Sequence, residues 1–295
     1  MPETYSAHNI QVLKGLEHVR KRPSMYIGST SLDGLHQLVF EIVDNSIDEA
    51  LVGFCTGISV QLQKGNVVVV DDDGRGIPVD VHPTERMSAL EVVMTKLNAG
   101  GKFDKNTYKV SGGLHGVGAS VVNALSEWCE VEVHRDGKVY YQRYVRGAPE
   151  KPVAVTADTT RHGTVTRFKP DKQIFEEIDF SFDVLSNRLR ELAFLTKGIH
   201  IAVSDERVVP GKSHIFHFDG GVKSFIEFLN KNKELIHQEP VYFDSERDHT
   251  RVEVGLQYND GYNETIFTFA NNINTREGGT HLIGFKSALT RCLND

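Results

Sequence analysis

Four polar side chains recur at helical spacing within one short stretch of the sequence: Glu41, Asn45, Asp48 and Glu49. Residues at i, i+4, i+7 and i+8 share one face of a helix, so three carboxylates and one amide would lie close together. Like charges repel one another at such distances unless a cation or a donor lies among them. A carboxylate beside an amide can activate a water molecule and hold a magnesium ion, because hard cations prefer oxygen ligands. A solvated acidic helix face is the alternative interpretation of this stretch taken alone.

The helix that would carry these side chains is predicted from Leu35 to Leu51. Apolar residues recur three and four positions apart on its other face, and they are Leu35, Leu38, Val39, Ile42, Val43, Ile47, Ala50 and Leu51. We therefore expect one face of this helix to pack on a core while the other carries the polar cluster.

Length and composition indicate a globular protein of one large domain or two ordinary ones. The chain has 295 residues, of which 39% are hydrophobic and 25% charged. A net charge of -7 argues against a whole-surface grip on nucleic acid, although DNA contacts could lie elsewhere. Cys55, Cys129 and Cys292 lack CxxC spacing, which argues against a disulfide framework or a zinc site and suits a reducing cytoplasm. No apolar run approaches membrane-spanning length, so no membrane partner is expected.

A second polar cluster follows a predicted hairpin, whose strands run from Ile58 to Leu62 and from Asn66 to Val70. The second strand leads into a run of aspartates and glycines from Asp71 to Pro78. A carboxylate at a strand end beside glycines suits a ligand that approaches the backbone closely, and Asp72 could accept a hydrogen bond from an exocyclic amine such as that of adenine. An acidic turn is the alternative. No dinucleotide fingerprint is formed, because the third glycine and the following helix are missing.

A glycine-rich loop precedes another predicted helix. Ser88 is expected to cap a helix that reaches Leu97, with Glu91 at the capping-box position. The loop then runs into the glycines of residues 112–119 and a helix from Ser120 to Leu125. Free backbone N–H groups and the positive end of the helix dipole make such a site ready for an anion, which favours phosphate binding over a plain flexible loop. A Walker A loop is excluded, since no Gly-Lys-Ser/Thr follows.

The remaining elements alternate between strands and helices, which indicates a layered α/β fold. Strands are expected at 128–133 and 139–145, paired as a hairpin through the turn Arg135-Asp136-Gly137-Lys138, and at 163–168, 199–203, 214–218, 252–258 and 265–270. Helices are expected from Asn9 to about Val19 and at 183–195, 221–229 and 281–293. A boundary near Pro210 to Asp219 divides the prediction into domains 1–213 and 214–295. Because the last helix ends the chain without a further strand, we expect the second domain to be incomplete and the chain to be a fragment of a longer protein.

Four stretches resemble, in order and spacing, the nucleotide-binding motifs of the GHKL ATPase superfamily. They are the Glu41–Glu49 helix, the Asp72–Pro78 turn, the Gly113–Gly118 loop and Gly163-Thr164. Flanking segments are similar to those of the DNA gyrase B family over essentially the whole chain; they are Val19–Pro23, Leu97–Phe103, Tyr108–Gly118 and Asn274–His281. The resemblance implies a GHKL (Bergerat-type) α/β sandwich that binds ATP, followed by a truncated α/β transducer domain.

The resemblance also implies roles for individual residues. Glu41 would be the general base for the water that attacks the γ-phosphate, and Asn45 would ligate Mg²⁺. Asp72 would bind the adenine amino group, helped by Thr164 through water. Further nucleotide contacts are implied for Glu49 paired with Arg75 at the adenine edge, for Gly76, Ile77 and Pro78 in the pocket floor, for Lys102 and Tyr108 on the lid, and for Gly113, Leu114, His115, Gly116, Val117, Gly118 and Ala119 around the triphosphate.

Partners are implied in the same way. Tyr5 and Ile10 would lie in an arm that crosses to a second copy of the chain, so that Tyr5 reaches ATP in the other protomer. Arg135 would line the mouth where aminocoumarin inhibitors bind. The whole enzyme would work with DNA gyrase A, its breakage-reunion partner, on DNA. ATP-dependent dimerisation would close a DNA gate, and the enzyme would introduce negative supercoils.

The sequence departs from the family pattern at three points. The family usually has two histidines before the general base, and here the pair is His36 and Gln37. We hypothesise that Glu41 still works but is positioned by hydrogen bonding alone. Ser24 replaces a usual glycine, which we expect to be neutral, and no segment before Asp295 matches the lysine loop that touches the γ-phosphate. Catalysis by this chain alone is therefore expected to be weak.

Three other interpretations remain at this point. The ATPase subunit of topoisomerase IV shares many of the same segments. An ATP-gated clamp chaperone or mismatch-repair clamp is a second alternative, against which the full lid motif and the Asn274–His281 segment argue. A histidine kinase would need a phosphoacceptor helix domain upstream, and there is no room for one before Tyr5.

Overall fold

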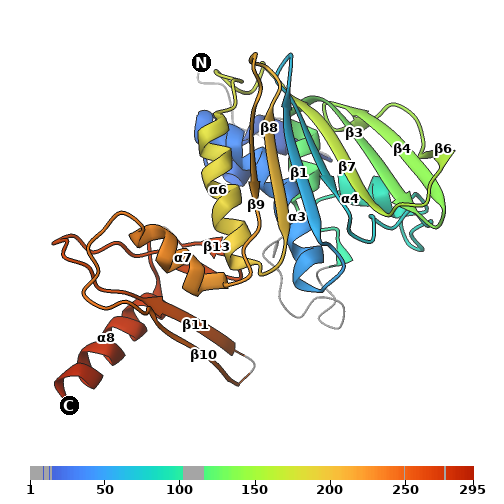
Figure 1. Cartoon of the computed structure of the whole chain (residues 1–295). Coiled ribbons are helices and arrows are strands. Elements are labelled where there is room, and N and C mark those ends of the chain that lie inside the picture. The colour runs from blue at the N-terminus through green and yellow to red at the C-terminus, as the bar shows by residue number, and fades with distance from the viewer. Residues whose placement is uncertain (1–8, 10–12, 14, 102–115, 249, 276) are drawn as a thin grey trace, which may run out of the picture.

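The structure of the chain is a computed structural model, and it describes residues 9, 13, 15–101, 116–248, 250–275 and 277–295. Two bodies are visible in Figure 1, a large sandwich of one sheet with helices and a smaller unit that contains the C-terminal end. Among the described residues, no helix combines the length and the apolar character that crossing a membrane requires.

A nine-stranded sheet forms one layer of the sandwich, with the strand order β5-β4-β3-β7-β2-β1-β8-β9 and with β6 also paired to β4. All of these pairs are antiparallel except the parallel pair of β1 and β8. The strands are β1 (Gly57–Gln63), β2 (Val67–Asp72), β3 (Ser126–Arg135), β4 (Lys138–Val145), β5 (Ala148–Pro149), β6 (Ala154–Asp158), β7 (Gly163–Pro170), β8 (His200–Asp205) and β9 (Lys212–Phe216). The predicted hairpins β1–β2 and β3–β4 are both present.

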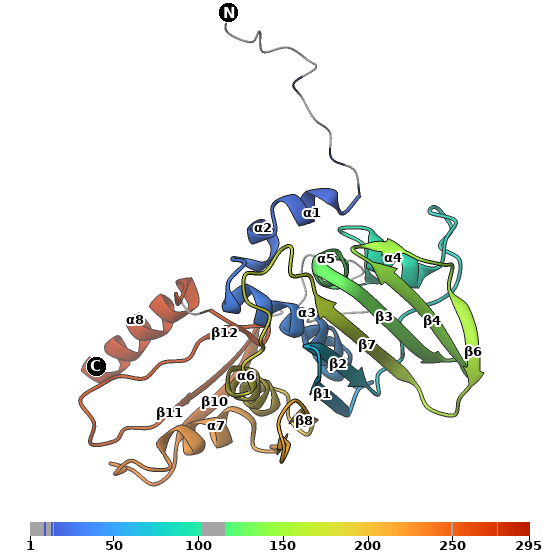
Figure 2. The same ribbon diagram turned by 90° about the horizontal axis from the view of Figure 1, so that it is seen from above.

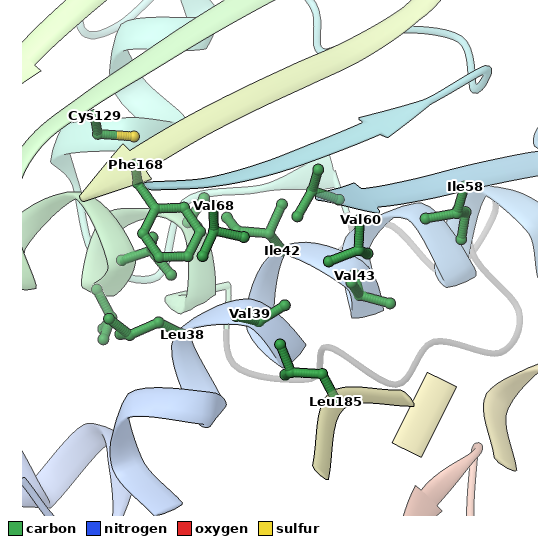
Figure 3. Packing of buried hydrophobic residues seen from close by; sticks show 14 of the residues in the cluster. Leu38, Val39, Ile42, Val43, Ile58, Val60, Val68, Cys129, Phe168 and Leu185 are labelled. Atoms are coloured by element: carbon green, nitrogen blue, oxygen red, sulfur yellow. The ribbon is translucent and has the colours of Figure 1, made fainter. Parts of the chain in front are cut away.

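Helices form the second layer against one face of this sheet (Figures 1 and 2). They are α1 (Glu17–Lys21), α2 (Ser24–Ile27), α3 (Leu32–Leu51), α4 (Ala89–Thr95), α5 (Gly118–Leu125) and α6 (Phe182–Leu195). The apolar stripe of α3 faces the sheet as its spacing predicts, and Figure 3 shows Leu38, Val39 and Ile42 beside Val68 and Phe168 in the core. The predicted layered α/β architecture is therefore confirmed.

The smaller unit contains α7 (Gly221–Asn230), the hairpin β10 (Val241–Arg247) and β11 (Thr250–Leu256), the short pair β12 (Phe269–Ala270) and β13 (Ile273–Asn274), and α8 (Thr280–Asn294). Strand β10 is absent from the sequence prediction, and the strand expected at 265–270 is reduced to its last two residues. None of the residues of α8 is buried.

The predicted domain boundary at 213/214 lies inside strand β9. This strand pairs with β8, and the register places Phe216 opposite Ile201, so its residues belong to the large sheet. Sheet membership depends on a pairing partner that local patterning does not reveal. We propose that the boundary between the two domains follows Phe216.

Two local predictions are corrected by the structure. Helix α4 does begin after Ser88, but no capping box forms, because the Ser88 hydroxyl donates to the Val79 carbonyl and Glu91 accepts from the Gln142 amide at 2.7 Å. Both side chains therefore form hydrogen bonds with residues outside α4 instead of capping the helix. Near the N-terminus the described helix begins at Glu17 rather than at Asn9, and residues 10–12 and 14 lie outside the described residues.

Candidate active site

Helix α3 presents Glu41, Asn45 and Glu49 as half-buried side chains on its polar face. Asp48, which the sequence places on the same face, is fully buried. The three carboxylates predicted for that face therefore differ in exposure, since Asp48 is shielded from solvent while Glu41 and Glu49 are half-buried. Helical spacing predicts which face of the helix carries a residue, whereas the burial of its side chain depends on the elements that pack around the helix.

The carboxylate of Glu41 is held by one side chain and lies close to the start of α5. The Gln37 amide donates from Nε2 to Glu41 Oε1 at 2.8 Å, one turn earlier on the same helix. The other oxygen lies against the first residue of α5, where a Cβ added to Gly118 would stand 2.4 Å from Glu41 Oε2. A side chain at position 118 would therefore displace the Glu41 carboxylate from this position. The carboxylate is thus held by a neutral amide at the N-terminal end of a helix, where free N–H groups favour anions.

Asp72 ends strand β2 and receives three hydrogen bonds. The Ser46 hydroxyl donates to Oδ2 at 2.8 Å, and the backbone N–H groups of Gly74 and Thr164 donate to Oδ1 at 2.9 and 3.3 Å. Burial raises the pKa of this carboxyl, and the three donors oppose that rise. A carboxylate has about four lone-pair positions, so Asp72 keeps capacity for one more donor, as binding an exocyclic amine would require.

The neighbours of Asp72 serve other purposes. Asp71 forms an ion pair with Arg161 on the far side of strand β2. Asp73 accepts from the Thr56 and Gly57 N–H groups at 2.7 and 2.8 Å and from the Thr56 hydroxyl at 2.5 Å. Burial alone would raise the pKa of Asp73, but these donors outweigh it and lower that pKa. Of the three consecutive aspartates, only Asp72 accepts a hydrogen bond from helix α3.

The predicted pair of Glu49 and Arg75 is present as a two-pronged ion pair. Arg75 donates from Nε and Nη2 to the two carboxylate oxygens, each at 2.8 Å, and its guanidinium lies 4.1 Å from the centre of the Phe54 ring. Arg75 also lines an open hollow of about 370 Å³, together with Phe54, Arg135, Asp136 and His162.

The floor beside this hollow is built by backbone groups. Arg135 donates from Nη1 to the Gly76 carbonyl at 3.0 Å, and the Ile77 N–H reaches the Thr164 hydroxyl at 3.4 Å. Pro78 follows as an exposed residue. Gly163 is required here, because its φ is +131° and a Cβ would stand 1.9 Å from the Asp72 carbonyl oxygen.

Part of the predicted site lies outside the described residues: Tyr5, Lys102, Tyr108, Gly113, Leu114 and His115. Gly116, Val117, Gly118 and Ala119 are described and form the entry to α5, which begins two residues earlier than the sequence predicts. The Gly116 carbonyl accepts from the Ala99 N–H at 3.2 Å, so the two ends of the glycine-rich segment meet.

Sequence reasoning missed Ser46, Phe54 and His162. Ser46 is buried and orients Asp72, and its signal was a hydroxyl standing inside the apolar stripe of α3. His162, which contacts the Gly74 carbonyl at 2.7 Å, and the exposed Phe54 carry no comparable signal, since only the fold brings them beside Arg75.

The donor set fits a magnesium ion held mainly by phosphate. Mg²⁺ usually keeps several waters and takes one or two protein oxygens together with substrate phosphates. Asn45 offers an amide oxygen one turn after Glu41, on the face of α3 that carries the general-base candidate. The chain would thus supply one ligand, and the anion at the end of α5 would supply others.

Two family models match the chain. Residues 30–174 match the model described as "Histidine kinase-, DNA gyrase B-, and HSP90-like ATPase", and residues 221–295 match "DNA gyrase B". Both matches include elements already described, the first covering α3, the Asp72 turn and α5, and the second beginning at α7.

Several known proteins are similar over nearly the whole chain. The DNA gyrase B protein of Clostridium acetobutylicum is 58% identical over 294 residues, and that of Treponema pallidum is 58% identical over 292 residues; each match covers 99% of this chain. The chain spans about half the length of these curated relatives, namely 46% of each.

A solved structure is also similar, the 43K ATPase domain of Thermus thermophilus gyrase B in complex with an aminocoumarin. It has a TM-score of 0.82 and 43% identity, and the match covers 98% of this chain and 74% of that one. The expected GHKL-type sandwich followed by a transducer-like domain is thereby confirmed.

Proposed function

Because this chain belongs to the DNA gyrase B family, we propose that it binds ATP with Mg²⁺ and hydrolyses it as the ATPase region of a type II DNA topoisomerase. One observation carries the proposal: Glu41 is held by Gln37 against the first residue of α5, on the same helix whose Ser46 orients Asp72. A base, an anion-binding helix end and an adenine acceptor thus share one site.

Each residue has a physical role in this mechanism. Asp72 accepts a hydrogen bond from the adenine amino group, and Thr164 assists at the same end of the pocket through water. The N-terminal N–H groups of α5 bind phosphate oxygens, and Asn45 holds Mg²⁺, which neutralises phosphate charge when bound. Glu41 accepts a proton from the attacking water, while Gln37 fixes the direction of the carboxylate. Phosphoryl transfer depends mainly on such positioning and charge neutralisation.

The activity of the longer protein follows as part of the same proposal. ATP binding would favour a dimer of two copies joined through the arm that contains Tyr5, since a ligand shifts a population only by binding one state better. Closure of that dimer would shut a DNA gate, and the enzyme together with DNA gyrase A would introduce negative supercoils in the cytoplasm. Because the relatives described above are gyrase B proteins, they support this assignment over topoisomerase IV and over a clamp chaperone.

An aminocoumarin is the expected inhibitor. The Thermus thermophilus relative was solved with one bound. In this chain the hollow beside Arg135 and Arg75 adjoins the Asp72 end of the site, so such a ligand would bind there without needing the phosphate end.

Calorimetric titration of the chain with a non-hydrolysable ATP analogue and Mg²⁺ tests the proposal. We expect binding by the wild type, loss of binding in Asp72→Asn, and binding that is lost or no longer responds to Mg²⁺ in Asn45→Ala. Asp73→Asn is the matched control, because its carboxylate serves Thr56 and Gly57 instead of the pocket. Wild-type protein that binds an aminocoumarin but no analogue would overturn the phosphate end of the site, and binding of neither ligand would overturn the whole pocket.

A further inference from the structure

A buried carboxylate and two arginines lie at the C-terminal end of α5, opposite the end that meets Glu41. Asp171 is buried, and its Oδ2 accepts from Arg20 Nη2 at 2.7 Å and from Arg146 Nε at 2.8 Å. The Gln173 N–H donates to Oδ1 at 3.0 Å. Burial alone would raise the pKa of Asp171, but these contacts outweigh it and leave that pKa lowered.

Of the two arginines, Arg20 is the one that also contacts the helix. Arg20 donates from Nη1 to the Ala124 carbonyl at 2.7 Å, and the backbone N–H of Asp171 donates to the Leu125 carbonyl at 3.0 Å. The last carbonyls of a helix lack partners within it and carry partial negative charge, so a guanidinium there satisfies and stabilises them. Within the part of the chain that the structure describes, Arg146 makes its side-chain bond to Asp171 and none to α5, and it is more exposed, at 44% against 19% for Arg20.

Helix α5 is suited to carry an effect from one end to the other. Every residue from Ala119 to Leu125 is buried, and α1 packs against the helix. Leu16 and Val19, which flank Arg20 on the N-terminal side, are themselves buried. A helix of eight residues spans only about 12 Å, and in a close-packed core it shifts as a unit. Loss of its C-terminal anchor would therefore move Gly118 relative to Glu41.

We infer that Arg20 is a positioning residue for the phosphate end of the site, which it holds in place by anchoring α5 to Asp171 and to the N-terminal segment. The inference rests on the proposed ATP site, because it concerns the anion that the start of α5 would bind. Arg20 acts through α5 and touches no substrate itself. The N-terminal segment that contains α1 is thereby coupled to the catalytic centre by two hydrogen bonds from one guanidinium.

Paired substitutions separate this role from simple neutralisation of Asp171. Arg20→Met removes both contacts, whereas Arg146→Met removes only a contact to Asp171. Arg20→Lys keeps a positive charge but has no planar fork to span a carboxylate and a carbonyl. Each variant would be titrated by calorimetry with the non-hydrolysable ATP analogue and Mg²⁺, and separately with an aminocoumarin, which reports the Asp72 end and the integrity of the fold.

We expect Arg20→Met and Arg20→Lys to weaken binding of the analogue by about tenfold or more, with aminocoumarin affinity changed by less than about twofold. Arg146→Met should change neither affinity by more than about twofold. The inference would be overturned if Arg20→Met and Arg146→Met lost equal affinity for the ATP analogue. It would also be overturned if Arg20→Lys lost equal affinity for the analogue and the aminocoumarin, or if the Arg20 variants bound the analogue as tightly as wild type. Failure of the wild type to bind the analogue would instead contradict the proposed function.

Discussion

Asp72 and Asp73 are neighbours in the sequence, yet their different surroundings shift the pKa values of their carboxyl groups in opposite directions. The carboxyl of Asp72 lies inward beneath Ser46 with a raised pKa, while that of Asp73 is bound by Thr56 and Gly57 with a lowered pKa. A raised pKa in the folded state means that ionisation costs stability as the pH rises through that pKa. A lowered pKa contributes stability above the unfolded value of about 3.9, and this is lost as the pH falls through the folded pKa.

Asp72→Asn and Asp73→Asn should therefore change thermal stability with opposite pH dependence. The stability of Asp72→Asn relative to wild type should be highest at about pH 7, and this gain in stability should disappear toward about pH 4. Asp73→Asn should cost about 2 kcal/mol at neutral pH and cost less as the pH approaches the unfolded value. Thermal unfolding of both variants and of wild type across this range is the measurement, and parallel curves for the two variants would contradict the assignment of these environments.

Gln37 is the residue through which the base is held. Gln37→Leu removes the hydrogen-bond donor to Glu41 Oε1. We expect kcat to fall about tenfold and the affinity for the ATP analogue to change by less than about twofold, because this bond orients the base and does not bind substrate.

Gln37→His should make turnover depend on pH near the histidine pKa of about 6.5. Steady-state ATPase assays decide this, with the exposed Gln173→Leu as control. Turnover unaltered in Gln37→His would argue against a tuning role.

At the scale of elements, the site depends on how closely the end of β2 approaches the start of β7, its antiparallel neighbour in the sheet. Gly163 opens β7 with a φ of +131°, and its missing side chain lets the Asp72 backbone pass. Gly163→Ala should cost about 3 kcal/mol or more, because both the clash and the backbone strain must be relieved. Gly198→Ala, with φ +79° but nothing within 4 Å, should cost only about 1 kcal/mol. Urea unfolding compares the free energies of unfolding of the two variants, and equal costs would show that the close approach of β2 and β7 at Gly163 can relax.

At the scale of the whole molecule, α6 belongs to both bodies. Phe194 is buried and stacks on Phe218 with ring centres 3.6 Å apart, and it also contacts Phe225 and Phe228 of α7. Arg190 lies 5.2 Å from the rings of both Phe216 and Phe228. The junction is therefore an aromatic cluster around one helix that also covers the sheet.

Phe194→Ala should loosen this junction at a cost of about 3 to 5 kcal/mol while leaving binding of the ATP analogue intact. Hydrogen exchange of the α7 amides should accelerate, because Phe225 and Phe228 of α7 lose their contacts with the Phe194 ring. Phe168→Ala is the matched control, since Phe168 is equally buried but lies in the sandwich core, and it should weaken the sandwich and nucleotide binding together. Unchanged exchange in α7 would contradict the role given to Phe194.

The sequence by itself determined the elements whose signals are short-range. The stripe of α3 and the β1–β2 and β3–β4 hairpins follow from spacing and turn residues, such as Asp136 and Gly137 with φ of 52° and 76°. The order of the four motifs was likewise readable along the chain. Only the tertiary structure decided the burial of Asp48, the separate partners of Asp71, Asp72 and Asp73, the place of β9 in the large sheet, and the contact of Arg20 with Asp171 across 151 positions. The reason is physical: periodicity acts between residues a few positions apart, whereas burial and ion pairing depend on which distant segments the fold brings together.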